Sequence, residues 1–493
     1  MSQSFSLRII RNFGFLTSGR VLGDLFTFVL FVALSRRFGA EGIGTYSFAM
    51  TLTGTVGIVA EFGLSALCIK EVSRLSGSLS DEIGRYLSVR LLLSCVLFAV
   101  FFAVLPFTPW SYETKLIIAL LGVYTVAKVL GAGIHVVFLA REKTHAVAGL
   151  EILLKAGAAI AGISVIVAGG DLALAVAALA VAALLNLFVS GGVLIRSYGV
   201  PPLLLPWRRV KATIRDAVPH ALSAIIFQIN PGIVILSLGF VLGEIAVGVY
   251  SVSYKVVFVA ATIPHFIALS LFPTASSLFA TSKAKFRSLF NHSASVAVLL
   301  GVPAAAGLWL IAPQLIVLLY GESFLESAPI LRLLSFVLLV AFLSRIMGVF
   351  LIAGERQVEK TRAEGIGVGV TCVLLLILIP SFGVAGAAAA IVISETAVVV
   401  LYLFRLNQLV GWPNLRGRVA ISCIGVAAFF IPLTLVNPIP VGVVIPVAII
   451  VYGLILMVFR ETREHELRMV VTMLRSVRQR STPPGADVSP NGR

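Results

Sequence analysis

Charge is scarce in this sequence. Only 12% of the 493 residues are Asp, Glu, Lys or Arg, whereas 59% are hydrophobic. A chain of this length with so few charges is too apolar to be a water-soluble protein. The composition therefore predicts a polytopic membrane protein whose apolar segments cross the bilayer as helices.

Residue patterns typical of metal binding, disulfides, nucleotide binding or catalysis are scarce as well. The four cysteines show no CxxC spacing and no Cys/His ligand pattern, so we expect neither a disulfide nor a metal site. The sequence has no GxxxxGKS or GxxxxGKT loop, which argues against nucleotide hydrolysis by this chain. The connections predicted to face outward are short, and none gathers the His, Asp, Glu and Ser side chains that a membrane glycosyltransferase would need. We therefore expect a protein that is not an enzyme.

Runs of apolar residues give the expected topology. They predict about fourteen spans of about 20 residues. The predicted spans are 15–35, 44–67, 88–107, 116–140, 147–168, 172–195, 217–241, 248–272, 289–311, 333–353, 366–381, 384–404, 419–436 and 441–459. Of the 38 Lys and Arg residues, only Arg36, Arg37, Lys115 and Arg332 fall in the odd-numbered connections. By the positive-inside rule, we expect both termini to be cytoplasmic. The net charge of +16 then faces anionic lipid rather than nucleic acid.

A short motif occurs twice in the chain. Residues 39–47 read GAEGIGTYS after the first predicted span, and residues 243–251 read GEIAVGVYS after the seventh. Gly, Gly, Tyr and Ser recur at a constant offset of 204 residues, from 39 to 243. Because an even number of spans separates the copies, the two six-helix blocks share one orientation. The motif therefore predicts two lobes of six helices each.

The predicted organisation follows from these blocks. It comprises an N-terminal lobe (1–195), a cytoplasmic linker (196–216), a C-terminal lobe (217–406), two further helices (407–459) and a partly disordered cytoplasmic tail (460–493). The linker is marked by two adjacent prolines and a run of basic residues.

Seven ionisable side chains lie deep within predicted spans. They are Arg20, Asp24, Glu61, Lys128, Lys255, Arg345 and Glu395. A charged side chain at membrane depth costs about 3 kcal/mol, so together they would cost about 20 kcal/mol if they faced lipid. We therefore expect them to line an internal aqueous cavity. Four cations against three carboxylates indicate a transporter with an anionic cargo.

Four of these residues also have a purely structural interpretation. Arg20 and Asp24 lie one helical turn apart and can neutralise each other in an intrahelical ion pair. Lys128 and Lys255 can extend their ammonium groups toward a membrane surface, although each lies several residues from the end of its span.

Three carboxylates are candidates for coupling transport to an ion. Glu61 and Glu395 have no cation within one turn on their own helices, so each can take up a proton or remain a neutral structural group. Asp24 can pair with Arg20 while the cavity is empty and can bind a proton once an anionic cargo occupies Arg20. We therefore expect coupling to H+ or Na+ and no other cofactor.

Several stretches resemble one family. Residues 11–47, together with Phe62-Gly63-Leu64-Ser65 and residues 70–74, are similar to the opening of the Wzx-type oligosaccharide flippases. Further similar stretches are 319–324, 328–332 and 383–388. These flippases belong to the multidrug/oligosaccharidyl-lipid/polysaccharide exporter superfamily, which has a MATE-like fold.

The resemblance implies an all-α, V-shaped fold of two six-helix lobes with two extra C-terminal helices. It also implies a flippase that moves a polyprenyl-diphosphate-linked oligosaccharide across the inner membrane, for O-antigen, capsule or exopolysaccharide assembly. Arg20, Lys128, Lys255 and Arg345 would then hold the diphosphate, and Tyr124 would face the sugars. The partners implied are this cargo, membrane lipids, and a polysaccharide polymerase and glycosyltransferases.

Two alternatives remain open. A lipid II flippase, which carries the peptidoglycan precursor, would share the fold and the cationic cavity. A cation-coupled multidrug exporter would share the fold but would need an acidic cavity for cationic drugs.

Overall fold

The computed structural model describes residues 2–72, 79–202, 206–413, 423 and 426, and every regular element among these residues is helical. The helices are α1 (Ser2–Glu61), α2 (Leu64–Val72), α3 (Leu79–Val104), α4 (Tyr112–Ala140), α5 (Thr144–Val167), α6 (Leu172–Tyr198), α7 (Trp207–Val241), α8 (Glu244–Ala260), α9 (Thr262–Thr281), α10 (Lys283–Tyr320), α11 (Ala328–Ala353) and α12 (Gln357–Val410), with two short 3-10 helices, η1 (Leu105–Phe107) and η2 (Glu322–Ser327). Nine helical segments of this described part are long and apolar enough to cross a membrane. The predicted all-α polytopic membrane fold is confirmed.

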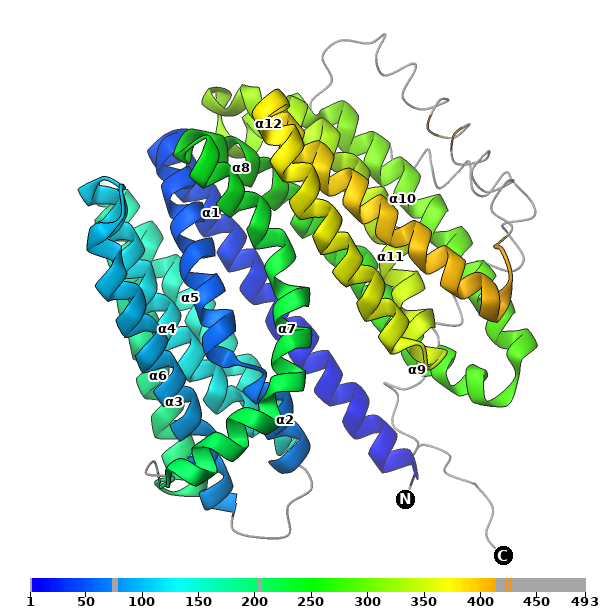
Figure 1. Cartoon of the computed structure of the whole chain (residues 1–493), viewed down its shortest axis with the longest axis horizontal. Coiled ribbons are helices and arrows are strands. Elements are labelled where there is room, and N and C mark those ends of the chain that lie inside the picture. The colour runs from blue at the N-terminus through cyan, green and yellow to red at the C-terminus, as the bar shows by residue number, and fades with distance from the viewer. Residues whose placement is uncertain (1, 73–78, 203–205, 414–422, 424–425, 427–493) are drawn as a thin grey trace, which may run out of the picture.

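Two of the helices each contain two predicted spans. α1 bends at Gly39 (φ 67°, ψ −168°) and α12 at Gly383 (φ 56°, ψ −133°). These dihedral angles are readily adopted only by glycine, because it has no Cβ. The first two predicted spans therefore lie on the two sides of Gly39, and the eleventh and twelfth lie on the two sides of Gly383. Figure 1 shows the chain turning back at both bends.

The remaining predicted spans up to the twelfth also fall on helices. The third to seventh coincide with α3 to α7, the ninth with α10 and the tenth with α11. The eighth is divided between α8 and α9 at Ala261. Apart from residues 423 and 426, the predicted spans 419–436 and 441–459 and the predicted tail 460–493 lie outside the described residues.

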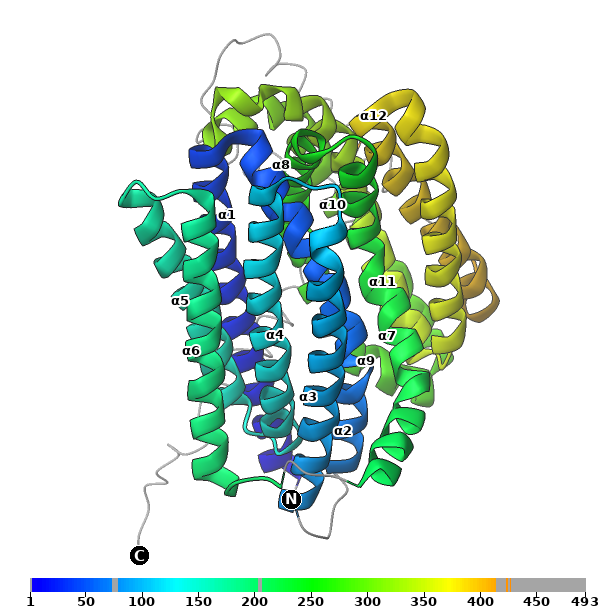
Figure 2. The ribbon, with the colours of Figure 1, turned by 60° about the vertical axis from the view of Figure 1, so that its left-hand side comes forward.

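The helices form two groups that meet at one end of the molecule and separate toward the end that bears the N-terminus (Figure 1). α3 to α6 belong to one group and α9 to α12 to the other. α8 packs on α1 and also on α11, and so connects the groups. Figure 2 shows the first group from another side, where α3, α4 and α6 run nearly parallel. The chain passes from α6 to α7 within the predicted linker, whose boundaries stay predictions.

A second repeat appears in the backbone. The turns between α4 and α5 and between α11 and α12 each contain a left-handed glutamate, Glu142 (φ 58°) and Glu355 (φ 61°), which are 213 residues apart (142 to 355). The amide hydrogen bonds around them correspond one to one. In the first turn, the amides of Arg141, Glu142 and Lys143 donate to the carbonyl oxygens of Val137 (3.2 Å), Leu139 (3.0 Å) and Phe138 (2.9 Å). In the second turn, the amides of Gly354, Glu355 and Arg356 donate in the same order to those of Phe350 (2.9 Å), Ile352 (3.0 Å) and Leu351 (2.8 Å). The same local structure therefore recurs in the two halves of the chain.

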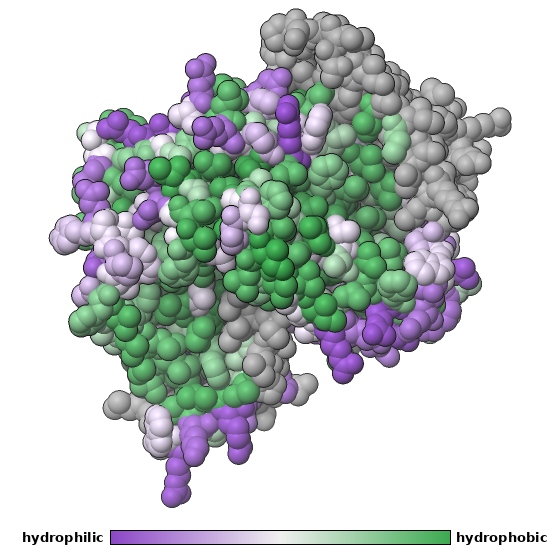
Figure 3. Space-filling view, turned by 45° about the horizontal axis from the view of Figure 1, so that its top comes forward, coloured by the Kyte–Doolittle hydropathy of each residue, from purple (hydrophilic) through white to green (hydrophobic). Residues whose placement is uncertain are grey.

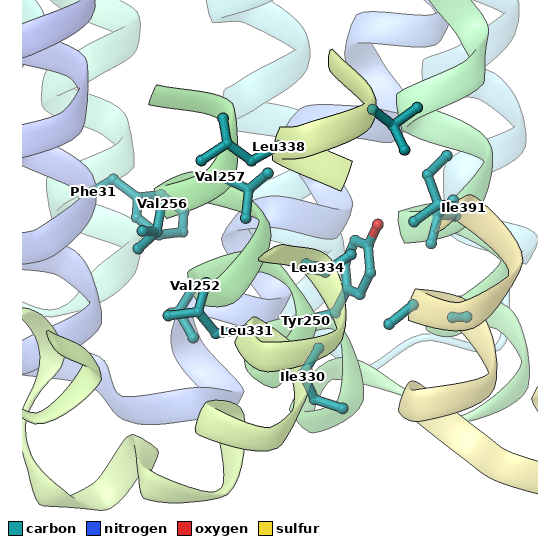
Figure 4. Packing of buried hydrophobic residues seen from close by; sticks show 14 of the residues in the cluster. Phe31, Tyr250, Val252, Val256, Val257, Ile330, Leu331, Leu334, Leu338 and Ile391 are labelled. Carbon is teal, nitrogen blue, oxygen red and sulfur yellow. The ribbon is translucent and has the colours of Figure 1, made fainter. Parts of the chain in front are cut away.

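The interior is apolar and extends across both groups of helices. Figure 4 shows Phe31 of α1 beside Val256 of α8, and Leu334 of α11 beside Tyr250 of α8. Large apolar side chains are also exposed on the outer surface, where Figure 3 shows a broad hydrophobic area with polar residues toward its edges. An apolar surface of this size is typical of a protein surrounded by lipid.

Candidate functional site: a cluster of lysines around Asp24

The ion pair expected within α1 is replaced by one between helices. Asp24 accepts a hydrogen bond from Nζ of Lys155 on α5, at 2.8 Å. Among the described residues no ion pair joins Asp24 to Arg20, whose side chain is exposed. The expectation of an Arg20–Asp24 pair was wrong because α1 packs closely on α5, and this contact brings Lys155 to the carboxylate. The Asp24 and Lys155 side chains are 35% and 25% exposed, so the pair is within reach of solvent.

Two further lysines lie near this pair. Lys255 of α8 is within electrostatic range of Asp24, Lys155 and Lys128. Its Nζ atom lies 5.5 Å from the centroid of the Phe31 ring on α1, close enough for a cation–π interaction. Lys128 of α4 is within electrostatic range of Asp24 as well. Lys128, Lys155 and Lys255, which we call the lysine cluster, therefore lie near one carboxylate and come from three different helices.

Lys128 lies near carboxylates on two neighbouring helices. It lies in the middle of α4, yet its side chain is exposed. Glu151 of α5 and Glu61 of α1 are both within electrostatic range of it. These carboxylates on two neighbouring helices favour an internal position of Lys128 over extension to a membrane surface.

Glu61 has a partner that its own helix did not reveal. Nη2 of Arg90, on α3, lies 3.4 Å from Oε1 of Glu61 and donates a hydrogen bond of 3.0 Å to the Ser65 hydroxyl. The Arg90 side chain is only 3% exposed. Between α1 and α2, Phe62 (φ 46°) and Gly63 (φ 67°) both adopt left-handed conformations. Arg90 thus connects the last residue of α1 to the first turn of α2 across this strained break.

A second charged group lies on α11 and α12. Arg345 of α11 and Glu364 of α12 are both within electrostatic range of Glu395. Glu364 accepts hydrogen bonds from Lys360 Nζ at 2.6 Å and from the Tyr402 hydroxyl at 3.0 Å. Glu395 is therefore placed among charged partners in the folded chain, although none lies within a turn of it on α12.

Arg20 and Arg345 lie near the same histidine. His265 of α9 is within electrostatic range of both Arg20 and Arg345. Arg20 belongs to the first half of α1, and Arg345 belongs to α11 on the other side of the molecule. The four cations expected from the sequence thus lie in two places, Lys128 and Lys255 around Asp24, and Arg20 and Arg345 around His265.

Tyr124, which the resemblance would place beside the sugars, is a buried residue. Tyr124 is 8% exposed and Tyr250 is 1% exposed, so both are buried. Tyr124 lies within electrostatic range of Lys155, behind the lysine cluster. A direct contact between Tyr124 and a cargo is therefore not supported by this arrangement.

Sequence reasoning overlooked Lys155, Arg90 and Glu151. All three lie within predicted spans, and Glu151 and Lys155 are four residues apart on one face of α5. Their depth in these spans was the signal that would have found them, since a charge inside a span marks a functional or paired group. Their partners were not predictable, because Asp24 and Glu61 belong to another helix.

The lysine cluster is suited to an anion with several oxygen atoms. The three ammonium groups, together with Arg90 on Glu61, outnumber the nearby carboxylates Asp24, Glu61 and Glu151 by one, which leaves a local excess of positive charge. In surroundings less polar than water, this charge attracts an anion more strongly than it would in bulk solvent. Within the described residues, no group of three or more His, Cys, Asp and Glu side chains is arranged to hold a metal ion.

Comparison with known proteins gives a family match and one curated relative. The family model described as "Polysaccharide biosynthesis protein" matches residues 9–279. The probable flippase AglR of Haloferax volcanii is 30% identical over 222 residues, which are 44% of this chain and 46% of AglR. The alignment thus spans about half the length of this relative.

Solved structures resemble the chain over most of its length. The lipid II flippase MurJ in an inward closed conformation superposes with a TM-score of 0.76 at 15% identity, covering 90% of this chain and 98% of MurJ. A multidrug resistance MATE family transporter in an inward-facing conformation gives a TM-score of 0.57 at 17% identity, covering 78% of this chain and 95% of the transporter. At these identities the likeness concerns the fold.

Proposed function

The chain belongs to the polysaccharide biosynthesis protein family, and from this premise we propose that it is a flippase for a polyprenyl-diphosphate-linked oligosaccharide. It acts in a cell membrane, by our proposal the bacterial inner membrane with both termini cytoplasmic, and supplies glycan units for a surface polysaccharide. It is a transporter rather than an enzyme. The probable flippase AglR, similar to about half of the chain, supports this assignment.

The observation that carries the proposal is the lysine cluster. Lys128, Lys155 and Lys255 extend from three apolar helices to the surroundings of one aspartate. Such an excess of positive charge at membrane depth is expensive unless an anion is bound there for part of the cycle. The diphosphate of a lipid-linked glycan has the charge and the number of oxygen atoms that three ammonium groups can bind.

The proposed cycle is alternating access between the two groups of helices. The groups separate at the end that the distribution of basic residues assigns to the cytoplasm, so the cargo would reach the lysine cluster from that side (Figure 1). The diphosphate would compete with Asp24 for Lys155. Closing the open end and separating the opposite ends would then expose the cargo to the other face.

Ion coupling is assigned to the carboxylates near the cations. Once the diphosphate has taken Lys155, Asp24 faces an anion and loses its partner, so it would bind a proton. Glu61 and Glu395 are further candidates, each with a charged partner on another element or turn. Loading of cargo and uptake of H+ would thus be linked at one residue, and Na+ is the alternative ion.

The multidrug exporter is less well supported than the flippase. A cationic drug would be repelled by the lysine cluster, since the cations there, with Arg90 on Glu61, outnumber the carboxylates Asp24, Glu61 and Glu151. A lipid II flippase also carries a polyprenyl diphosphate, so its cargo would be bound by the same cluster. The distinction between these cargoes lies in the sugar.

Deletion of the gene tests the proposal. A strain without the protein should accumulate one lipid-linked oligosaccharide on the cytoplasmic leaflet, and mass spectrometry of the extracted lipids identifies it. Accumulation of lipid II in place of a surface-polysaccharide unit would move the assignment to the peptidoglycan precursor. If no lipid-linked sugar accumulates and resistance to cationic drugs falls instead, the flippase assignment is wrong.

A further inference from the structure

The aliphatic chain of Lys155 passes directly over Gly23. A Cβ atom added at Gly23 would lie 2.5 Å from Cδ of Lys155, 3.4 Å from Nζ and 3.5 Å from Cε. Gly23 is buried in the contact of α1 with α5, and Asp24 follows it immediately. The route of Lys155 from α5 to the Asp24 carboxylate therefore depends on the absence of a side chain at position 23.

We propose that Gly23 is the positioning residue for Lys155: its bare Cα provides the space in which the lysine chain lies, so that the ammonium group reaches Asp24 and the lysine cluster. This inference rests on the proposed function, because it assigns Lys155 to the cations that bind the diphosphate. Any larger residue at position 23 displaces Lys155 from the cluster without removing its charge.

The contact at Gly23 differs from ordinary close packing of helices. One turn earlier on α1, a Cβ at Gly19 would lie 2.8 Å from Cβ and 3.2 Å from Cα of Ala148, so a substitution there pushes two backbones apart. At Gly23 the three nearest atoms all belong to the flexible end of one lysine. Gly23→Ala should therefore be accommodated by a change of the Lys155 rotamer, with the helix packing retained.

α5 itself offers a matched control. Gly157 lies two residues from Lys155 on the same helix, and a Cβ added there would have no neighbour within 4 Å. Gly157→Ala makes the same chemical change without touching Lys155.

A stability cycle without cargo tests the positioning. In the wild type and in Gly157→Ala, Asp24→Asn removes the hydrogen-bonded Asp24–Lys155 pair and should lower the Tm of the purified protein in detergent. In Gly23→Ala the Asp24–Lys155 pair is already broken, so Asp24→Asn should add little. An equal loss of Tm in all three backgrounds overturns the proposal. If Gly23→Ala does not accumulate, Lys155→Ala in the same chain should restore it by freeing the space, and failure to restore it equally overturns the proposal.

A binding cycle tests the consequence for cargo, with undecaprenyl diphosphate as the probe and the full chain in lipid nanodiscs. Gly23→Ala and Lys155→Ala should each weaken the Kd by about tenfold, which is the loss of about one charge-assisted contact. The double variant should equal Lys155→Ala alone, and Gly157→Ala should equal the wild type. Additive losses in the double variant contradict a role through Lys155. A wild-type protein that does not bind the probe contradicts the proposed function, whereas the stability cycle judges the positioning by itself.

Discussion

Gly44 and Gly248, which occupy the same place in the two copies of the repeated motif, lie against each other at the end of the molecule where the two groups of helices meet. A Cβ added at Gly44 would be 1.8 Å from the carbonyl oxygen of Glu244 and 3.0 Å from the amide nitrogen of Gly248. A Cβ added at Gly248 would be 1.9 Å from the carbonyl oxygen of Ala40. The contact is thus reciprocal, because Ala40 and Glu244 are themselves 204 residues apart, and it joins α1 to α8 through backbone atoms alone.

Arg36 adds a second connection at this end. Its Nε donates a hydrogen bond of 2.7 Å to the carbonyl oxygen of Leu319, and its guanidinium also contacts the carbonyl oxygen of Leu318. Both acceptors lie in the last turn of α10, where a cation is favoured by the free carbonyl groups of the helix end. The glycine contact and Arg36 therefore both join the helices at the end where the two groups meet, and both would have to separate in the proposed alternating access.

Gly248→Ala should open this end. The added methyl group cannot avoid the Ala40 carbonyl, and overpacking of this kind costs about 1–3 kcal/mol in the conformation where the ends touch. Spin labels at the exposed positions Tyr112 and Leu325 should therefore show a longer distance population in the variant than in the wild type. Gly54→Ala is the control, since a Cβ there would have no neighbour within 4 Å. Unchanged distances in Gly248→Ala would show that the glycine contact does not hold the end closed.

Reporter fusions test the proposed orientation. Ser197, at the end of α6, should lie in the cytoplasm, and Gly170, between α5 and α6, should lie outside. A cytoplasmic signal at Gly170 would refute the helix count and the direction in which the V opens.

Loss of Arg90 should destabilise the N-terminal helices. Arg90→Met leaves Glu61 without its cation, and breaking a buried pair costs about 3 kcal/mol when one partner is partly exposed, as Glu61 is at 31%. Unfolding in detergent should therefore begin at a lower temperature, and Glu61→Gln in the same chain should recover part of the loss. The pair would have no stabilising role if Arg90→Met kept the wild-type Tm, or if Glu61→Gln lowered it further.

Asp24→Asn should remove the dependence of transport on pH. In the proposed cycle, the cargo would take Lys155 from Asp24 and the carboxylate would then bind a proton, so transport should accelerate as the pH falls. Asparagine resembles the protonated state permanently, so the variant should bind cargo but vary in rate by less than about twofold between pH 6 and pH 8. The measurement is flipping in proteoliposomes across a pH series. A wild-type pH profile in Asp24→Asn would place the proton elsewhere, with Glu61 and Glu395 as the next residues to test.

The helical framework was predictable from local properties of the chain. Short stretches of sequence are enough to recognise the apolar runs, the bends at Gly39 and Gly383 between adjacent spans, and the repeat at positions 39 and 243. A span is recognised by its own composition, because lipid surrounds it whatever its neighbours are. The turn repeat at Glu142 and Glu355 was not predictable, because its two copies have the same backbone hydrogen bonds but little sequence in common.

The pairing within the site was not predictable for a different reason. Helical spacing places Arg20 and Asp24 on one face, but it does not say which face of α5 meets them. That choice is made by small residues such as Gly23, which lets Lys155 reach Asp24, and a glycine in an apolar helix gives no sign of what lies over it. Arg90 escaped notice likewise, because its partner Glu61 is distant in sequence.

Flipping by the purified, reconstituted protein tests the central claim most directly. Proteoliposomes that contain a fluorescent polyprenyl-diphosphate-linked sugar would be assayed with the wild type and with the two test variants Lys255→Gln and Arg345→Gln. The control variant is Lys211→Gln, which removes an exposed charge of α7 that is not part of the lysine cluster. The account predicts flipping by the wild type and by Lys211→Gln, and a loss of at least about tenfold in Lys255→Gln and Arg345→Gln at normal abundance in the membrane. Wild-type rates in both Lys255→Gln and Arg345→Gln would contradict it.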